Sequence, residues 1–423
     1  MDSKERLAAP EGKSRIVVVG AGLVGLACAH ALADEGHIVT VVDREGPAAG
    51  ASRGNAGWLA HTDIDPLASP GMLLQVPKFL SDPLGPLSIR REYLLTILPW
   101  LVRLLAASRP GRLRHTVEAI VALNSLAMPA WDRLSAELRI GHFIHRRGGL
   151  FAYDSAADFA RDREKFARQR SFGIEVVELP QAELRQMEPS LSDAVVGAAF
   201  YPEAAHVSDP RLVAEALAGA AQLRGIDLVK AEVTALAAGP GVLLQLRDQA
   251  PIMADRCVLA AGAWSRKLAR DVGDSIPLET ERGYNVSFPD ALPGLSRPVS
   301  FAGQGFVATP LTTGLRIGGA VELGGLALPP NHDRTRALHT KAQRFLRDLP
   351  AFDSGTVWMG HRPSIPDSLP VIGLSRDGPE VVYAFGHGHY GLTQSAATGS
   401  LVADLIAGRP SAIDLKPFSP QRF

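Results

Sequence analysis

The sequence is poor in the residues that build disulfide frameworks and metal centres. Its 423 residues include only two cysteines, Cys28 and Cys257, and both stand in apolar stretches. A cysteine in such a setting packs as a small apolar residue, so we expect neither a disulfide framework nor a thiolate-bound metal. The histidines show no H-x-x-x-H spacing that would favour a metal site. This cysteine usage is typical of a reducing, cytoplasmic location, and we expect no bound metal ion.

A net charge and a long apolar run are also missing. Lysine plus arginine and aspartate plus glutamate both total 44, so the charge balance gives no indication of a nucleic-acid partner. No uncharged apolar run reaches the ~18–20 residues that a membrane-spanning helix needs. Residues 1–14 are polar and of mixed charge, and we interpret them as a loose tail rather than a signal peptide. A chain of 423 residues exceeds what a single core usually holds, so we expect two domains.

A glycine motif between two apolar strands organises the N-terminal part of the chain. Residues 16–19 and 38–42 are β-branched apolar runs, as in buried strands. Between them, glycines with the spacing G-x-G-x-x-G open a helical pattern, and an acid ends the second strand. The first glycine allows a tight turn, the second lets a pyrophosphate approach, and the third lets the helix pack on the strand. These residues, Gly20, Gly22, Gly25 and Asp43, predict a site for an adenine dinucleotide.

A second glycine motif near the C-terminus has the same spacing but a different meaning. Gly386, Gly388 and Gly391 follow an apolar strand and precede a helical pattern over residues 393–407. Residues 408–423 offer no second strand with an acidic tip, so a second nucleotide unit does not fit. We interpret the motif as a helix N-terminus directed at the same cofactor, because its N–H groups suit an oxygen anion or a carbonyl.

Several other stretches predict helices. Apolar periodicity favours helices over residues 116–138, 156–171, 210–223 and 334–349. Before the first of these lies an apolar helix around Trp100 with a basic end. One interpretation is a buried or partner-facing helix, and the other is a surface that touches a membrane, apolar on one side and basic at its rim.

Taken together, the motifs resemble those of the FAD-dependent D-amino acid oxidase superfamily, and within it the D-amino acid dehydrogenase branch. The similarity rests on VVVGAGLVG with Asp43, GASRGNAG, VLAAGAWS, HRPSIPDSLPVIG and YAFGHGHYGLTQS, in the family's order. It implies a mixed α/β (α+β) fold, a Rossmann-like FAD-binding domain with an interleaved antiparallel-sheet substrate domain. On that basis the FAD-binding domain would comprise residues 15–85, 205–268 and 355–423, and the substrate domain residues 86–204 and 269–354.

The resemblance also implies which residues would contact FAD. The first glycine motif and Asp43 would hold its ADP half, the loop after Asp43 its pyrophosphate and ribityl chain, and the C-terminal loop its flavin. The expected cofactor residues are Gly20, Gly22, Gly25, Asp43, Arg44, Ser52, Arg53, Asn55, Ala56, Gly57, Val233, Ala261, Gly262, Gly388, His389, Tyr390, Gly391, Leu392 and Thr393.

The implied reaction transfers a hydride from the α-carbon of an amine to flavin N5, while the protein positions the substrate. Arginine holds a substrate carboxylate with two parallel hydrogen bonds, and Arg362 matches the family's substrate-side arginine. The alternative for Arg362 is a structural ion pair. Arg282 and Tyr284 lie on the expected substrate sheet, where they would bind the carboxylate or gate the pocket, unless Arg282 is merely an exposed strand arginine. His389 would face the flavin, with no assigned role in proton transfer.

These features predict FAD-dependent oxidative deamination of a D-amino acid, or of a cyclic relative such as D-proline or a hydroxyproline. The branch resemblance and the apolar–basic helix favour a dehydrogenase that passes electrons to a quinone or dye-type acceptor, at the inner face of the membrane. Two alternatives stay open. One is a glycine- or sarcosine-type oxidase that uses oxygen, and the other is a non-catalytic FAD-binding subunit.

Overall fold

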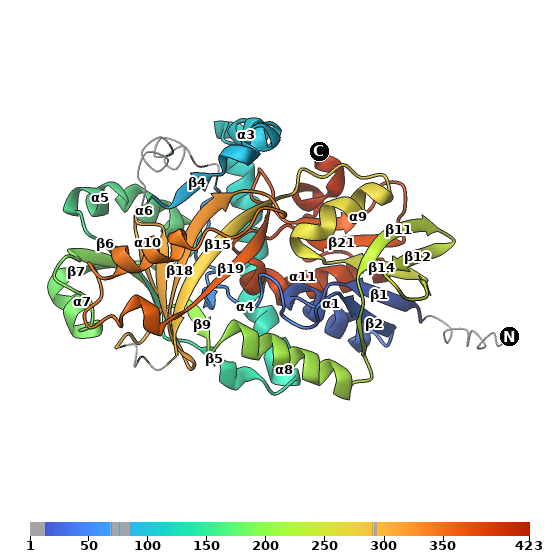
Figure 1. Ribbon diagram of the computed structural model, residues 1–423, viewed down its shortest axis with the longest axis horizontal. Helices are drawn as coiled ribbons and strands as arrows, with labels where there is room; N and C mark the ends of the chain where they lie inside the picture. The colour runs from blue at the N-terminus through green and yellow to red at the C-terminus, as the bar shows by residue number, and fades with distance from the viewer. Residues whose placement is uncertain (1–12, 68, 70–75, 77–84, 290, 292–293) are drawn as a thin grey trace.

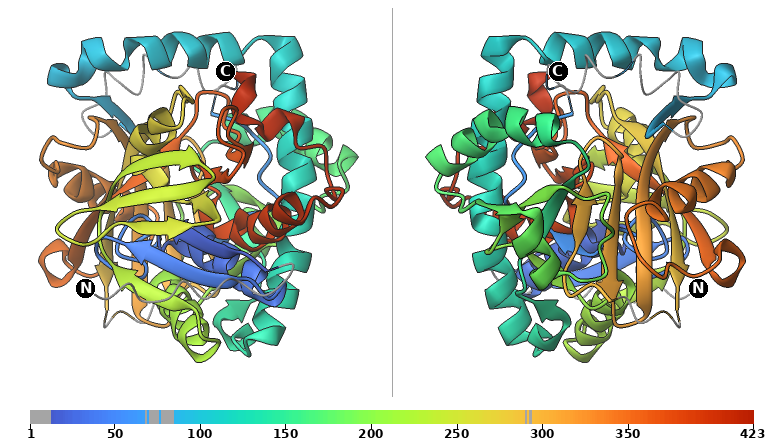
Figure 2. Two further views of the ribbon diagram at one scale, coloured as in Figure 1. Left: turned by 90° about the vertical axis from the view of Figure 1, so that its right-hand side faces the viewer. Right: turned by 90° about the vertical axis from the view of Figure 1, so that its left-hand side faces the viewer.

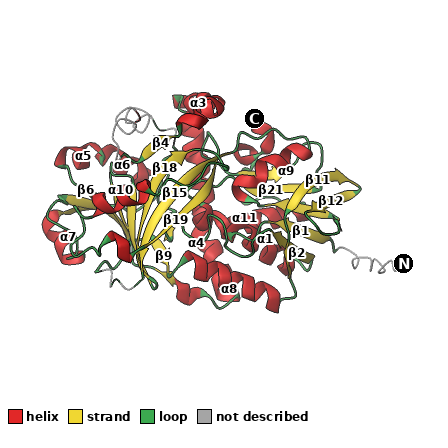
Figure 3. Ribbon diagram, viewed as in Figure 1, coloured by secondary structure: helices red, strands yellow, loops and turns green. Residues whose placement is uncertain are grey.

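The computed structural model describes residues 13–67, 69, 76, 85–289, 291 and 294–423. The tail expected over residues 1–14 therefore lies almost wholly outside the described residues. The described chain forms two lobes, one around a sheet that contains β1 (Arg15–Val19) and one around a larger sheet that contains β15 (Glu279–Phe288) (Figure 1). Strands dominate the middle of both lobes, and helices lie around them (Figure 3).

The sheet of the first lobe is buried on both faces. Its strands run parallel, except that the edge strand β20 runs antiparallel to β21. Ile16 and Val18 enter the core on one face, and Val17 and Val19 enter the core on the other. Burial on both faces explains the continuous apolar runs in the sequence. Among the described residues the order is β10 (Asp227–Lys230), β2 (Ile38–Asp43), β1, β14 (Arg256–Leu259), β21 (Val381–Phe385) and β20 (Val371–Leu374).

Helices cover one face of this sheet and a small antiparallel sheet covers the other. The helices are α1 (Leu23–Asp34) and α11 (Gly391–Ala407), which pack against each other, with α8 (Pro210–Leu223) on the outside of α1. The opposite face packs against β11 (Val233–Gly239), β12 (Gly241–Leu246), β13 (Ile252–Ala254) and α9 (Ser265–Asp271).

The first glycine motif makes the turn from β1 into α1. Gly20 has a φ of +112°, which favours glycine. Gly25 packs against the carbonyl group of Gly20, and a side chain at either position would overlap backbone atoms. The turn is therefore as tight as the motif predicts, and it brings the N-terminus of α1 to the edge of the sheet.

The second lobe is built on a mainly antiparallel sheet, in which only the β6–β16 and β4–β18 pairs are parallel among the described strands. Its phenylalanine-rich core lies under α10 (Asp333–Ala342). In order, the strands are β19 (Thr356–Ser364), β15, β18 (Gly314–Leu323), β17 (Phe306–Leu311), β16 (Val299–Phe301), β6 (Gly149–Tyr153), β8 (Gly197–Tyr201) and β7 (Val177–Pro180), and β4 (Leu87–Ile89) pairs with β18.

The remaining elements join or cover the lobes. A small sheet of β3 (Trp58–Leu59), β9 (Ala205–Val207) and β5 (Ile144–His145) lies between them. Three short helices cover the far end of the large sheet: α5 (Ala156–Arg161), α6 (Arg163–Ser171) and α7 (Gln181–Met187). The helix expected over residues 156–171 is thus two helices that meet at Asp162.

Two longer helices connect the molecule's edge to its centre. α3 (Leu94–Ala107) lies across one edge, and α4 (Pro110–Glu137) runs from its end into the body (Figure 2). The indole N–H of Trp131 on α4 donates to the Leu392 carbonyl of α11 at 3.0 Å, and the Gln394 amide donates to Asn124 at 2.9 Å. α4 therefore packs on the first lobe, although the sequence assigns it to the substrate domain.

The strand β19 crosses the expected boundary in the other direction. It pairs with β15 in the large sheet, whereas residues 355–423 were expected in the FAD-binding domain. The expected division of the whole chain into domains stays a prediction.

Candidate functional site

One large cavity runs between the two lobes. It begins at the glycine turn after β1, passes the C-terminal glycine loop and reaches the underside of α3. Its volume is about 2620 Å³. Small-molecule pockets typically measure ~300–1,000 Å³, so this cavity has room for an extended cofactor together with a substrate.

The N-terminal end of the cavity has the features of a dinucleotide site. The Asp43 carboxylate accepts hydrogen bonds from the backbone N–H groups of Ala21, Glu45 and Gly46, each at 2.9 Å. These bonds hold the glycine turn against the loop after β2. Gly22, the N-cap residue of α1, provides no side-chain cap and lines the cavity. The helix N-terminus thus suits an anionic group such as a pyrophosphate.

A cluster of one arginine and two aromatic rings lines this end of the cavity. The Arg44 guanidinium lies 3.8 Å from the centre of the Trp264 ring, and the His361 ring meets the same indole edge-on at 5.4 Å. Burial and the charges of Arg282 and Arg44 lower the pKa of His361 to about 4, so the imidazole is neutral at pH 7. Trp264 and His361 lie within the VLAAGAWS and HRPSIPDSLPVIG motifs, but neither was among the expected cofactor residues.

The structure places most of the expected cofactor residues on the cavity wall, but three of them elsewhere. Gly25 packs inside the β1–α1 turn, the Arg53 side chain is exposed outside the cavity, and Thr393 accepts a hydrogen bond from the Ala60 N–H. The wall includes Gly20, Gly22, Asp43, Arg44, Ser52, Asn55, Ala56, Gly57, Val233, Ala261, Gly262, Gly388, His389, Tyr390, Gly391 and Leu392.

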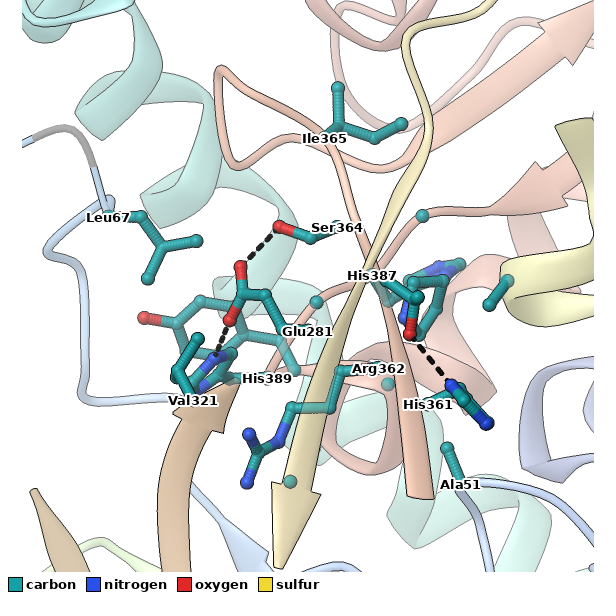
Figure 4. Close-up of a pocket in the computed structure, with 18 of the residues that line it drawn as sticks. Ala51, Leu67, Glu281, Val321, His361, Arg362, Ser364, Ile365, His387 and His389 are labelled. Carbon is teal, nitrogen blue, oxygen red and sulfur yellow. Dashed lines mark hydrogen bonds and ion pairs between the residues drawn. The ribbon is translucent and has the colours of Figure 1, made fainter. Parts of the chain in front are cut away.

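Arg362 enters the cavity from β19, beside the C-terminal glycine loop (Figure 4). Its Nη1 donates to the Ala320 carbonyl at 2.9 Å. The guanidinium lies against Gly283 of β15, where a side chain would overlap it. Burial lowers the pKa of Arg362 and nearby Glu281 raises it, and arginine still keeps its charge. A half-buried cation on a cavity wall is a ready site for a carboxylate.

Glu281, His389 and Ser364 form a polar cluster next to Arg362 (Figure 4). The Glu281 carboxylate is only 2% exposed, and it lies 2.9 Å from Nε2 of His389 and accepts a hydrogen bond from the Ser364 hydroxyl. Burial raises the pKa of Glu281, but the bonds from His389 and Ser364 and the charge of Arg362 outweigh it and lower the pKa overall. The sequence analysis missed Glu281, although its place next to Arg282 in ERGYN could have suggested it.

Arg282 and Tyr284 lie on the other face of β15, although Tyr284 still lines the cavity. Arg282 is fully buried, and its guanidinium binds Glu322 at 3.2 Å and the carbonyls of Gly325, Leu328 and Pro329. The Tyr284 hydroxyl donates to Glu322 at 2.8 Å and accepts from the Asn331 N–H. Because side chains alternate along a strand, Glu281 and Gly283 lie on the opposite face, toward Arg362. Arg282 does not line the cavity, so its expected role in binding substrate is wrong, and so is the expectation of an exposed arginine.

Metal-binding groups, reactive cysteines and membrane-spanning helices are not found in the described part of the chain. There, no group of three or more His, Cys, Asp and Glu side chains is arranged to hold a metal ion. Cys28 and Cys257 are both free and buried, and burial raises the pKa of each thiol to about 12. None of the described helices is long and apolar enough to cross a bilayer.

Comparisons with known proteins identify the family of the chain. Residues 15–405 match the family model described as FAD dependent oxidoreductase (DAO). The chain is 39% identical to a D-amino-acid oxidase of Bradyrhizobium diazoefficiens, over 98% of this chain and 100% of that one. It is 33% identical to D-amino acid dehydrogenase 2 of Ralstonia nicotianae, over 96% and 100% of the two chains. The crystal structure of glycine oxidase from Geobacillus kaustophilus matches with a TM-score of 0.72 at 25% identity, covering 97% of this chain and 99% of that one.

These matches span nearly the whole chain, and they confirm the expected fold, cofactor and family resemblance. The glycine turn, the acid at the tip of β2 and the length of the cavity fit FAD on structural grounds. The chain therefore belongs to the FAD dependent oxidoreductase (DAO) family, as an enzyme that uses FAD.

Proposed function

We propose that this protein oxidises a D-amino acid, or a cyclic relative such as D-proline or a hydroxyproline, and passes the electrons to a quinone or dye-type acceptor. The observation that carries this proposal is the half-buried Arg362 guanidinium on the cavity wall, next to the C-terminal glycine loop. The names of the two curated relatives support the same substrate class. The imino acid formed would hydrolyse to an oxo acid and ammonia when its nitrogen is unsubstituted.

FAD would lie along the cavity with its ADP half at the N-terminal glycine turn. Asp43 would face the adenosine ribose, and the N-terminus of α1 would face the pyrophosphate. The loop of residues 388–392 and the start of α11 would lie at the flavin end, where backbone N–H groups stabilise electron-rich oxygens. Bound in this way, FAD supplies the acceptor for the hydride that leaves the substrate α-carbon.

Arg362 would hold the substrate carboxylate. Among the described residues its one hydrogen bond runs from Nη1 to Ala320, so the guanidinium keeps donors for a ligand. Gly283 gives the guanidinium its space, and Ala320 fixes its position. A carboxylate clamped at this point would hold the α-carbon at a set distance from the flavin end of the cavity.

One spectroscopic experiment tests this function. The purified holoenzyme is mixed with single amino acids of either hand under anaerobic conditions, and the visible flavin absorbance is followed. We expect D-amino acids or D-proline derivatives to bleach the flavin and L-isomers to leave it unchanged. A flavin that no amino acid bleaches would favour the non-catalytic FAD-binding subunit and overturn the proposal.

The outer face of α3 supports contact with an anionic membrane surface. Its side chains include Leu95, Val102 and Leu105, which are 81%, 64% and 57% exposed. Basic residues surround this apolar face, and the cavity reaches the helix's inner face at Trp100 and Leu104. An apolar stripe with a basic rim suits the anionic lipids of an inner leaflet, and the cavity would give a lipid-soluble acceptor access to the flavin. The exposed arginines are Arg91, Arg103, Arg109, Arg112 and Arg114.

Vesicle binding tests the α3 surface directly. We expect the protein to sediment with vesicles that contain phosphatidylglycerol, but not with pure phosphatidylcholine, and to be released by salt. The double variant Leu95→Glu, Val102→Glu should abolish sedimentation, while Leu223→Glu on α8, also at a highly exposed leucine, should not. Equal sedimentation of the double variant would refute membrane contact. So would a native protein that binds no vesicles and forms a dimer that the double variant disrupts. A cytoplasmic location stays a prediction.

Oxygen is the second candidate acceptor, because the relative at 39% identity is named an oxidase. The two acceptors are separated by reoxidation of the bleached enzyme. Fast recovery of flavin absorbance on admission of air would favour an oxidase, and slow recovery in air with fast recovery on addition of a quinone analogue would favour a dehydrogenase.

A further inference from the structure

The cluster next to Arg362 contains more than a carboxylate clamp requires. We infer that Glu281 is a positioning residue, which orients the imidazole of His389 to accept a proton from the substrate amine. This inference rests on the proposed oxidation of an amino acid and adds to it the fate of the amine proton.

Glu281 and His389 differ in exposure: the acid is buried, and the base is open to the cavity. Glu281 is 2% exposed and lies within the sheet, whereas the His389 side chain is 42% exposed and lines the cavity. The distance of 2.9 Å between Nε2 of His389 and Oε2 of Glu281 is that of a hydrogen bond. The carboxylate therefore requires the hydrogen to be on Nε2, and Nδ1 keeps its lone pair.

Ser364 and the strand pairing fix Glu281 in place. The Ser364 hydroxyl donates to Oε1 of Glu281, so each carboxylate oxygen has its own donor. Glu281 and Arg362 are also direct partners in the pairing of β15 with β19. A buried carboxylate is stable only with such partners, and Glu281 consequently has little freedom to turn away from the imidazole.

Other charged or titratable groups lie near the pair. Arg362 on β19 interacts electrostatically with Glu281, Asp63 on the loop after β3 interacts with His389, and Tyr390 is the next residue of the C-terminal loop. Burial raises the pKa of Asp63, as does the neighbouring Asp65, although Lys165 opposes them. Glu281 is the group among these with a direct hydrogen bond to the imidazole.

The proton balance of the reaction calls for such a group. An amino acid is an ammonium ion at neutral pH, and its nitrogen has no lone pair until one N–H proton leaves. That proton would pass to Nδ1 of His389, the C–H bond electrons would leave the α-carbon as hydride to bound FAD, and the nitrogen lone pair would form the C=N bond. The imidazolium produced would be stabilised by the Glu281 carboxylate, as in other acid–histidine pairs.

The first test determines which ring nitrogen of His389 carries the hydrogen, in holoenzyme that is not turning over substrate. In holoenzyme labelled with ¹⁵N-histidine, the His389 signals are assigned by their loss in His389→Asn and followed over pH. We expect the hydrogen to be on Nε2 in the native protein. In Glu281→Gln the carboxylate acceptor is gone, so the signals should report hydrogen on Nδ1 in part of the population.

The second test uses the pH dependence of turnover. A base that must be neutral gives kcat/KM an acid limb, so Glu281→Gln should move that limb about one pH unit lower and reduce kcat about tenfold. His389→Asn should remove the limb and reduce kcat/KM about 100-fold. Ser364→Ala keeps the carboxylate and should have a smaller effect in the same direction.

Glu279→Gln is the matched control. Glu279 lies on the same face of β15 but accepts its hydrogen bond from the Tyr93 hydroxyl at 2.8 Å, away from His389. Its variant should keep the acid limb at the native pH. Retention of bound FAD and of the melting temperature shows that each variant is folded.

The outcomes separate this inference from the proposed function. If Glu281→Gln leaves both the histidine tautomer and the acid limb unchanged, Glu281 does not position His389. A raised KM with unchanged kcat and acid limb would instead assign Glu281 to Arg362 and overturn the inference. If no amino acid reduces the native enzyme, the proposed function fails, and the histidine tautomer still tests the pairing of Glu281 with His389.

Discussion

The two faces of β15 carry similar polar groups and use them in opposite ways. On the cavity face, buried Glu281 holds an imidazole that is open to a ligand, and Gly283 leaves room for Arg362. On the far face, Arg282 and Tyr284 converge on Glu322, and three backbone carbonyls bind the Arg282 guanidinium. The difference shows that the type of side chain does not identify a site. A group with donors or acceptors directed at a cavity can act on a ligand, and a fully satisfied group stabilises the fold.

The largest expected effect comes from removing the ion pair between Arg282 and Glu322 on the far face of β15. Arg282→Leu leaves the buried Glu322 with only the Arg90 guanidinium, 4.0 Å away, as a cation, and breaking a buried ion pair typically costs about 3–5 kcal/mol in the free energy of unfolding. We expect this loss in denaturant titrations, with KM of the folded fraction unchanged. Adding Glu322→Met should restore part of the stability, since both charges are then gone. An increase in KM with no loss of stability would reverse the assignment of the two faces.

Arg362→Leu should produce the opposite pattern. Truncating one partner of a buried charge pair costs about 2–5 kcal/mol, which here should appear in kcat/KM for the amino acid. The free energy of unfolding should change much less, because Arg362 bonds to one carbonyl where Arg282 bonds to three and a carboxylate. Arg376→Leu, at an exposed arginine, is the matched control. Unchanged kinetics would remove Arg362 from the site.

Gly283→Ala probes the same clamp without touching its charge. The added methyl group would overlap the Arg362 guanidinium and displace it. A displacement on the scale of 1 Å typically costs up to about 100-fold in kcat/KM. Gly318→Ala is the control, because the nearest atom to its new methyl group would be 3.4 Å away, an ordinary contact. Equal kinetics of the two variants would mean that the guanidinium position is not critical.

The smallest effect is expected for Tyr284→Phe. It removes the hydroxyl that donates to Glu322 on the far face, and a single hydrogen bond typically contributes about 1 kcal/mol. We expect that loss in the free energy of unfolding and no change in KM. Weaker substrate binding by this variant would show that the far face communicates with the cavity.

The nucleotide end of the site could be predicted from sequence because its signals are local. Gly20, Gly22 and Asp43 belong to one strand–turn–helix–strand unit, and the structure places all three on the cavity wall. The helix expected over residues 210–223 is likewise confirmed, with Pro210 in its first turn and an Asp209 cap. By contrast, the helix expected over residues 334–349 ends at Ala342, because Leu346 bridges to Leu191 in a contact between distant segments.

The substrate end could not be predicted in the same way. Nearly every residue of β15 is buried, so the strand shows no alternation of polar and apolar residues that would fix which side chains face the cavity. Arg282 was chosen by residue type and is one residue out of phase with Glu281, whereas Tyr284 does line the cavity. The partners of Glu281 come from β19 and the loop before α11, which no local pattern could bring together.

The order of strands in the first lobe has a consequence for how the chain folds. β1 at the start of the chain pairs with β14, which pairs with β21 near its end, and α1 packs on α11. During synthesis, β1 must wait for β14, and the free edge of β14 must then wait until almost the last residues have left the ribosome. Contacts between such distant segments form slowly, so we expect a long-lived, partly folded nascent chain that depends on protection from aggregation.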